Sequence, residues 1–125
     1  MFDKYLIVDD SLRATPDGFA FDAKLGYYRG IGLSMIEDLA ITLDGEAIPR
    51  DAVRFDEGEG PITLDSMETA YDRRWGFGAV ATISVVTGTP LEAGEHALTL
   101  TERLRVSYLP FPSLNSDAKT LSVAA

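Results

Sequence analysis

The chain has 125 residues and a formal net charge of −9, with no cysteine and one histidine. This length predicts a single domain, in which folding buries about two-thirds of the surface of the unfolded chain. The lack of cysteine excludes a thiol nucleophile, a disulfide framework and a cysteine-ligated metal, and one histidine excludes a histidine-rich metal site. The 20 acidic residues against 11 basic ones argue against nucleic-acid binding, because phosphate recognition needs clustered positive charge.

The sequence also indicates where the chain acts. No segment approaches the ~20 consecutive apolar residues that a membrane-spanning helix needs. The segment Met1–Asp10 contains three aspartates and lacks the basic and then apolar pattern of a secretory signal peptide. We therefore expect a cytoplasmic protein.

Alternating apolar and polar residues predict most of the strands, because successive side chains of a strand point to opposite faces. The alternation is clear in Gly18–Leu25 and in Leu39–Leu43, after which Asp44-Gly45 predicts the turn of a hairpin. The segment Ala79–Thr87 is rich in β-branched residues and carries no charge, which is typical of a central strand.

The remaining elements are less regular. The longest alternation, His96–Tyr108, has Glu102 in the middle of its apolar face, which predicts a bulge or a break. The segment Leu33–Leu39 fits either a helix or a bent strand. Asp65, followed three residues later by Glu68, predicts a capping box that opens a short helical turn.

Strands at this spacing, with frequent turns and no long helix, predict an all-β fold. We expect an immunoglobulin-like antiparallel β-sandwich that forms a single domain over residues 1–112. After Pro112, residues 113–125 are small and polar, and we expect them to form a C-terminal tail that is mobile at its end.

His96 is the only side chain whose ordinary pKa lies near neutral pH. As a functional group it would be a general base or a single metal ligand. As a structural group it would occupy the aromatic position of a β-sandwich corner, where a residue near the start of a strand bonds to backbone upstream. The segment Leu91–Leu98 favours the corner.

Arg73–Gly78 places two arginines beside the only tryptophan of the chain. Trp, Tyr and Arg anchor interfaces, because they bury a large area and keep a polar group. Trp75 therefore either fills the core or contacts a partner, with Arg74 beside it. Tyr27-Tyr28-Arg29 has the same character, since neighbouring strand residues face opposite sides and one tyrosine is directed outward.

The other charged clusters point to no catalytic machinery. We interpret Glu37-Asp38 as a strand boundary and the acidic segment Asp56–Gly60 as a solvated turn, because neither has the oxygen spacing of a calcium loop. The sequence contains no nucleophile with a base, no glycine-rich phosphate loop, no dinucleotide fingerprint and no paired metal ligands. We therefore expect no catalytic, cofactor-binding or metal-binding residue in this chain, and no enzyme that acts alone.

Several segments carry a family resemblance through their order along the chain. They are Met1–Asp3 with Ser11–Arg13, Gly18–Phe21, Tyr27–Ile31, Leu33–Leu39, Leu43–Gly45, Arg74–Gly78 and Arg105–Pro110. From Met1 to Pro112 they resemble the small β subunit of bacterial C-glycoside deglycosidases. No single motif carries the resemblance, which rests on the co-occurrence of the segments.

The resemblance implies a heteromeric carbon–carbon lyase of flavonoid and C-glucoside catabolism. Such an enzyme cleaves the bond between a 3-oxo-glucose unit and an aromatic aglycone. The resemblance further implies a TIM-barrel α subunit that holds a divalent metal, manganese, and the acid–base residues. Oxidation at C3 acidifies the C2 proton of the sugar, so that elimination expels the aglycone carbon; this needs a metal for the ketone and a base for the proton.

For this chain the resemblance implies a non-catalytic subunit of a hetero-oligomer. It would stabilise the α subunit and help to wall the pocket of a substrate that the α subunit mainly holds. The residues expected to contact the partner or the pocket are Tyr27, Tyr28, Arg29, Arg74 and Trp75. Two alternatives stay open, a free-standing carbohydrate-binding β-sandwich and a structural assembly module.

Overall fold

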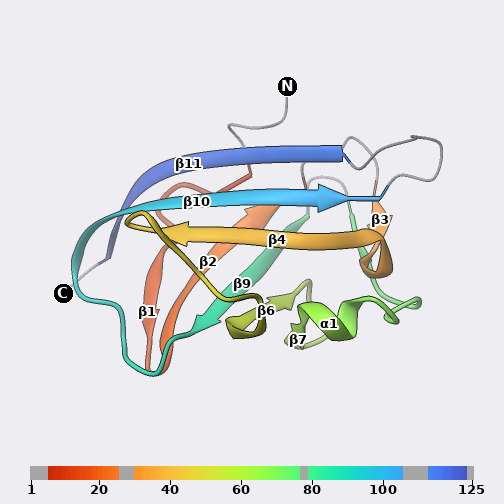
Figure 1. The fold of residues 1–125 in the computed structure, drawn as a ribbon, viewed down its shortest axis with the longest axis horizontal. Coiled ribbons are helices and arrows are strands. Elements are labelled where there is room, and N and C mark those ends of the chain that lie inside the picture. The colour runs from red at the N-terminus through yellow and green to blue at the C-terminus, as the bar shows by residue number, and fades with distance from the viewer. Residues whose placement is uncertain (1–5, 26–29, 77–78, 106–112, 124–125) are drawn as a thin grey trace.

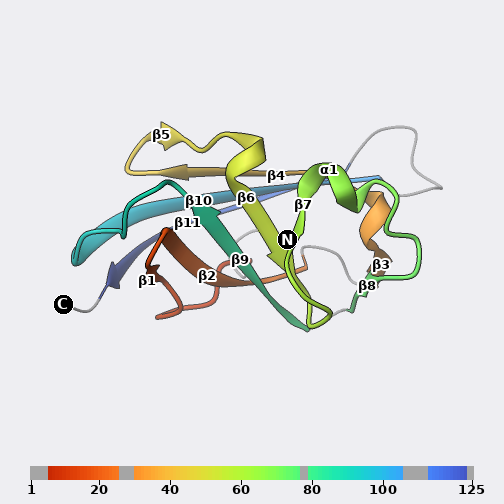
Figure 2. The same ribbon diagram turned by 90° about the horizontal axis from the view of Figure 1, so that it is seen from below.

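A computed structural model describes residues 6–25, 30–76, 79–105 and 113–123 of the chain. Within these ranges, most of the regular structure is antiparallel β-strand, arranged as two sheets that pack face to face (Figure 1). A third, two-stranded sheet lies at one end (Figure 2). The prediction of an all-β sandwich in a single domain is confirmed.

The first sheet has the strand order β1-β2-β9-β6-β7. Its strands are β1 (Arg13–Thr15), β2 (Gly18–Lys24), β9 (Val80–Val86), β6 (Val53–Asp56) and β7 (Ile62–Thr63). The strand β9 pairs with β2 on one side and with β6 on the other. The uncharged, β-branched segment is therefore a central strand, as its composition predicts.

The second sheet has the strand order β11-β10-β4-β5. Its strands are β11 (Ser113–Val123), β10 (Gly94–Leu104), β4 (Ile36–Leu43) and β5 (Glu46–Ala47). The predicted hairpin turn joins β4 to β5. Asp44 and Gly45 both have positive φ angles, 53° and 86°, as a two-residue turn that follows the twist of the strands requires.

The predicted C-terminal tail is wrong, because β11 belongs to the sandwich. All eleven residues of Ser113–Val123 pair with β10 without a shift in register, and Leu121 and Val123 are buried in the core. The inward face of β11 also carries Asp117 and Lys119, which interrupt the apolar period and hide the strand in the sequence. The last two residues, at which the tail was expected to be mobile, lie outside the described ranges.

The irregularity predicted at Glu102 is a bulge rather than a break. The strand β10 is continuous, but its register with β4 shifts between Arg103, which pairs with Asp38, and Leu104, which pairs with Ile36. Glu37 is therefore the extra residue, and the bulge lies in β4. The Glu102 side chain itself is fully buried.

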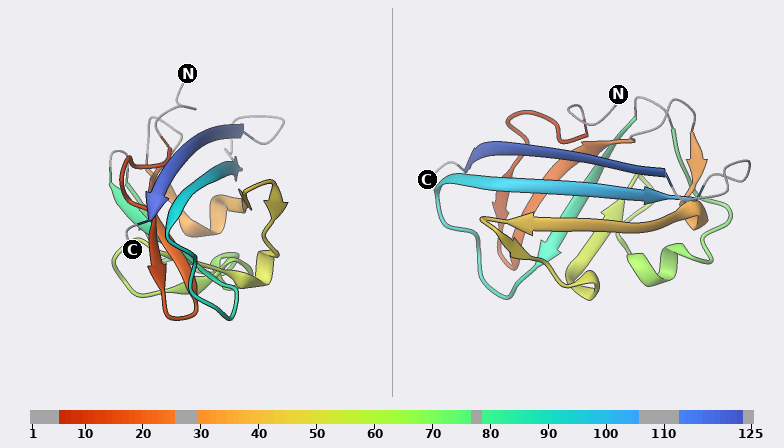
Figure 3. Two further views of the ribbon diagram at one scale, coloured as in Figure 1. Left: turned by 90° about the vertical axis from the view of Figure 1, so that its left-hand side faces the viewer. Right: turned by 45° about the horizontal axis from the view of Figure 1, so that its top comes forward.

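Short elements cover the end of the sandwich (Figure 3). They are β3 (Ile31–Gly32), β8 (Arg74–Trp75), the 3-10 turn η2 (Leu33–Met35) and α1 (Leu64–Met67), while a second 3-10 turn, η3 (Arg50–Ala52), directly precedes β6. The N-cap of the helix lies two residues before the predicted one, since Thr63 rather than Asp65 accepts the Ser66 N–H, at 3.2 Å. None of the helices in the described part of the chain is long and apolar enough to cross a membrane.

The core lies between the two sheets. Phe19, Phe21 and Ile83 enter it from the first sheet, while Leu39 and Leu100 enter it from the second, and all five are buried. Trp75 extends the same cluster towards the end that carries α1, β3 and β8. The packed core therefore continues beneath the short elements, which it holds against the sandwich.

Candidate functional site

Trp75, the centre of the expected contact cluster, belongs to the core. Its side chain is 0% exposed, its indole N–H donates to the Ala79 carbonyl at 3.0 Å, and its ring lies edge-on to Phe55 at a centroid distance of 4.9 Å. The prediction that Trp75 contacts a partner or a substrate is therefore wrong, because no surface of the residue is available. The core interpretation of Trp75 is the correct one.

Arg73 is engaged within the chain. Its Nε lies 2.8 Å from Glu57 Oε2, its Nη2 donates to Glu57 Oε1, and the same Nη2 donates to the Gly60 carbonyl at 2.6 Å. The Arg73 guanidinium holds the pKa of Glu57 below its ordinary value. The Glu57 side chain is only 7% exposed, so the acidic turn is held by the residue that precedes β8 instead of being freely solvated.

Arg74, in contrast, is exposed. Its Nη2 donates to the Gly30 carbonyl at 3.1 Å, and among the described residues no carboxylate forms an ion pair with it. Tyr27, Tyr28 and Arg29 lie outside the described ranges, so their role in a contact stays a prediction.

His96 bonds to the backbone upstream, as a corner residue does. Its Nε2 lies 2.8 Å from the Glu92 carbonyl and its Nδ1 lies 2.7 Å from Asp44 Oδ2. Both partners are acceptors, so the doubly protonated ring satisfies both contacts. The hydrogen bond to Asp44 holds the pKa of His96 above its ordinary value. The geometry therefore ties the β4–β5 hairpin to the start of β10.

A cleft of about 520 Å³ lies at the end of the sandwich that carries η2 and α1. Its lining residues come from η2, the start of β4, the turn after α1 and the end of β10; they are Ser34, Ile36, Glu37, Glu68, Thr69, Tyr71 and Arg105. Tyr71 is 76% exposed. Arg105 is also exposed, and among the described residues no carboxylate lies within ion-pairing distance of it. The cleft thus combines an open aromatic ring with a cation.

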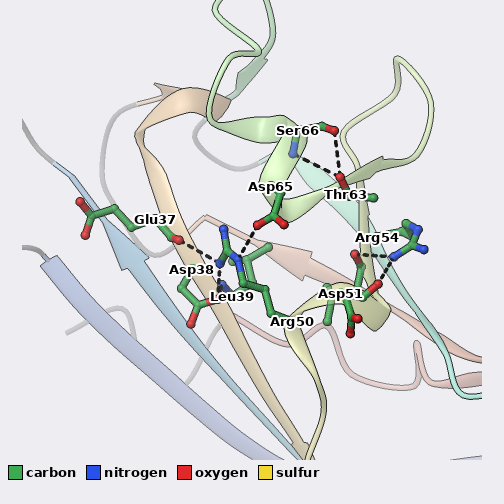
Figure 4. A network of polar contacts seen from close by, with 10 residues as sticks. Glu37, Asp38, Leu39, Arg50, Asp51, Arg54, Thr63, Asp65 and Ser66 are labelled. Carbon is green, nitrogen blue, oxygen red and sulfur yellow. Dashed lines mark hydrogen bonds and ion pairs between the residues drawn. The ribbon is translucent and has the colours of Figure 1, made fainter.

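Arg50 fixes one wall of this cleft (Figure 4). Its Nη1 donates to the Glu37 carbonyl at 3.0 Å and to Asp38 Oδ1 at 2.7 Å, and its Nε donates to Asp65 Oδ1 at 3.0 Å. These bonds connect the bulge of β4 to the first turn of α1. The Glu37 carboxylate is paired with Arg103 Nε at 2.8 Å, so this acidic residue of the cleft is already neutralised.

The cleft offers an exposed tyrosine and an exposed arginine for contacts. The carboxyl and imidazole groups with displaced pKa values are Asp44, Glu57 and His96, and none of them lines it. Within the described ranges, no three histidine or acidic side chains gather as metal ligands. Exposed tyrosine and arginine are instead the residue types that anchor protein interfaces.

Sequence reasoning missed Tyr71 and Arg105. The pattern identifies Tyr71 only as the last residue of a predicted helical turn, and Arg105 only as a polar position on a long strand. Because 34 residues separate them along the chain, no local spacing brings them together. The only available signal is that Arg105 begins one of the segments that carry the family resemblance.

Comparisons with known proteins identify the family. The model of the family described as C-glycoside deglycosidase beta subunit matches residues 2–108. The chain is 36% identical over 110 residues to the 3'-dehydrocarminate deglycosidase beta subunit of Microbacterium sp, which covers 88% of this chain and 83% of that protein. It is 26% identical over 121 residues to the C-glycoside deglycosidase beta subunit of Microbacterium trichothecenolyticum, covering 94% and 86%. The chain therefore belongs to the C-glycoside deglycosidase beta-subunit family.

Proposed function

We propose that this chain is the non-catalytic β subunit of a heteromeric lyase, which cleaves the C–C bond between a 3-oxo-glucose unit and an aromatic aglycone. The family match over residues 2–108 carries the proposal. The amino-acid composition of the chain supports it, because its single histidine has both ring nitrogens engaged within its own chain. A TIM-barrel α subunit would supply the divalent metal, manganese, and the acid–base residues.

The proposed reaction explains this division of labour. In this reaction a base removes the C2 proton of the 3-oxo sugar, and a metal held by the α subunit would polarise the C3 ketone. The electron pair left at C2 forms a double bond to C1, the bond from C1 to the aglycone breaks, and the aglycone carbon takes up a proton. In our proposal these steps occur on the α subunit, and the β subunit stabilises it and helps to wall the pocket.

We assign the contact with the α subunit to the end of the sandwich that carries the cleft. Tyr71 and Arg105 line the cleft and Arg74 is exposed on β8. Interface energy is concentrated in a few residues of these types. An exposed Tyr71 contributes little to the fold of its own chain, so a contact role gives a reason for its exposure.

The alternative of a carbohydrate-binding module loses the tryptophan as a stacking surface, although Tyr71 remains an exposed aromatic ring. Such a module stacks sugars on exposed aromatic rings, and the only tryptophan of the chain is fully buried. The assembly-module alternative shares the interface with our proposal and differs in one respect, since it predicts that turnover by the α subunit does not depend on this chain.

Assays of the separate subunits and of their mixture distinguish these readings. The candidate α subunit is a TIM-barrel protein, to be sought first among the products of the genes next to the gene of this chain. A suitable first substrate is 3'-dehydrocarminate, because a relative that is 36% identical is named for it. We expect no turnover by this chain alone and turnover by the mixture. Full activity of the α subunit without this chain overturns the proposal.

Alanine substitutions test the assigned surface. We expect Tyr71→Ala and Arg105→Ala each to weaken binding of the α subunit at least about tenfold, because truncating an interface anchor costs this much or more. The melting temperature should stay nearly unchanged, since both side chains are exposed. Val86→Ala, at a 43% exposed position of β9 outside the cleft, is the control. Unchanged affinity in both cleft variants contradicts the assignment.

A further inference from the structure

The strand β11 lies at one edge of the second sheet (Figure 1). It pairs with β10 over its whole length, and in the described part of the chain no other strand pairs with it. Alternate backbone N–H and C=O groups therefore point away from the sheet. At about 3.4 Å per residue, this edge is about 37 Å long.

This edge lacks proline and bulges, which are among the features that protect free strands from pairing. Natural edge strands are blunted by proline, by bulges or by charged side chains. Ser113–Val123 contains no proline or glycine, and its register with β10 has no shift. Its two charged side chains are engaged with the N-terminal segment, since Asp117 accepts the Ile7 N–H at 2.9 Å and Lys119 donates to the Ile7 carbonyl at 2.8 Å.

The outward face of β11 is small and uncharged. Its residues are Leu114, Ser116, Ala118, Thr120 and Ser122, all of them exposed. No long side chain on this face obstructs the approach of another strand.

We propose that two copies of this chain pair antiparallel through β11, about a two-fold axis at Ala118. Ala118 is the midpoint of Ser113–Val123, so all eleven residues of each strand are paired. This register places Asp117 opposite Lys119 of the second copy, and Lys119 opposite Asp117 of the second copy. The pairing adds on the order of ten backbone hydrogen bonds.

The charges select this register over its neighbours. A slip by two residues in one direction places Asp117 opposite Asp117 of the second copy, and a slip in the other direction places Lys119 opposite Lys119. Like charges directly opposite each other destabilise a strand pair. A slip by one residue would bring the buried face of one copy opposite the exposed face of the other. The axis at Ala118 is thus the only nearby register without conflict.

A cysteine cross-link tests the axis directly. The chain contains no cysteine, so Ala118→Cys introduces a single thiol. At the axis the two Cα atoms would lie about 4.5–5.5 Å apart, within the range of a disulfide. Ala40→Cys is the matched control, because Ala40 is exposed on the same sheet face, two strands away in β4. Under mild oxidation we expect at least about ten times more covalent dimer from Ala118→Cys; equal amounts overturn the proposal.

Charge substitutions at the same position give a second readout. Two lysines or two glutamates at the axis repel, so we expect Ala118→Lys and Ala118→Glu each to raise the dissociation constant of the dimer about fivefold. A mixture of the two variants restores the dimer through opposite charges, and Ala40→Lys leaves it unchanged. The mass of the wild-type chain is measured at increasing protein concentration. If it stays at the monomer mass of 13.6 kDa at every concentration, the proposal is overturned. A dimer whose dissociation constant Ala118→Lys leaves unchanged also overturns it.

The same variants separate this inference from the proposed function. The cross-link is measured on the full chain alone and again in the complex with the α subunit. If Ala118→Lys fails to bind the α subunit and the wild-type chain does not associate with itself, the edge contacts the α subunit. That result overturns pairing between copies. Failure of the turnover assay leaves the cross-link result untouched, because the two experiments use different surfaces.

Discussion

Replacing Trp75 tests whether the residue stabilises the core. The side chain is 0% exposed, and replacing a buried tryptophan by alanine costs about 3–5 kcal/mol. A domain of this size has a total stability of about 5–15 kcal/mol. At about 4 °C per kcal/mol, Trp75→Ala should lower the melting temperature by roughly 12–20 °C.

Trp75→Phe separates the hydrogen bond from the packing. Phenylalanine keeps an aromatic ring next to Phe55, whose centroid lies 4.9 Å from that of the indole. It loses the N–H that donates to the Ala79 carbonyl at 3.0 Å. Leaving that carbonyl without its donor costs about 1–3 kcal/mol, so Trp75→Phe should fall between the wild type and Trp75→Ala.

Thermal unfolding followed by circular dichroism measures both variants, and urea unfolding gives the free energies. Tyr71→Ala, at a 76% exposed aromatic position, is the control and should melt within a few degrees of the wild type. The mass of the complex with the α subunit is measured below the melting temperature of each variant. If Trp75→Ala melted within 3 °C of the wild type and yet failed to bind the α subunit, the core assignment would be refuted.

Two further predictions concern the ion pairs. The pKa of His96 is raised above 6.5 by its hydrogen bond to Asp44, and the pKa of Asp44 is lowered below 3.8 by the same bond. The stability that the pair contributes is therefore greatest between pH 3.8 and pH 6.5, and it is lost as pH rises through the raised pKa of His96. The difference in melting temperature between the wild type and His96→Gln should therefore shrink above pH 6.5. A difference that does not change with pH would contradict the pairing. Arg73→Ala leaves the Glu57 carboxylate, which is 7% exposed, without its cation, and should cost about 1–3 kcal/mol at neutral pH in urea unfolding. The double variant Arg73→Ala with Glu57→Gln should recover part of that loss of stability, because it removes the unpaired charge. If the losses of the two single variants simply add in the double variant, the unpaired charge is not the cause.

The sequence predicts those parts of the fold in which a strand has one apolar face. Gly18–Lys24 and Val80–Val86 alternate or are uniformly apolar, and both are strands where the pattern places them. The turn at Asp44-Gly45 is predicted for a local reason, because few residue pairs accept two positive φ angles. These signals lie within a few residues of one another, so one sequence suffices to find them.

The missed features depend on contacts between distant segments. Ser113–Val123 reads as a polar tail because Asp117 and Lys119 occupy inward positions, and their partners Ile7 and Asp9 lie more than a hundred residues away. Trp75 lies in a two-residue strand, which is too short to show on which face its side chain lies. The burial of Trp75 is decided instead by Phe55 and Ala79.

The two proposed surfaces are compatible with each other in space. Arg105 directly follows Leu104, which pairs with Ser113 at one end of β11. The proposed axis passes through Ala118, five residues further along the strand, or about 17 Å away. Antiparallel pairing therefore places the clefts of the two copies at opposite ends of the joined edge, about 34 Å apart. Each cleft can bind its own α subunit, so the smallest complex that uses both surfaces contains two copies of each subunit.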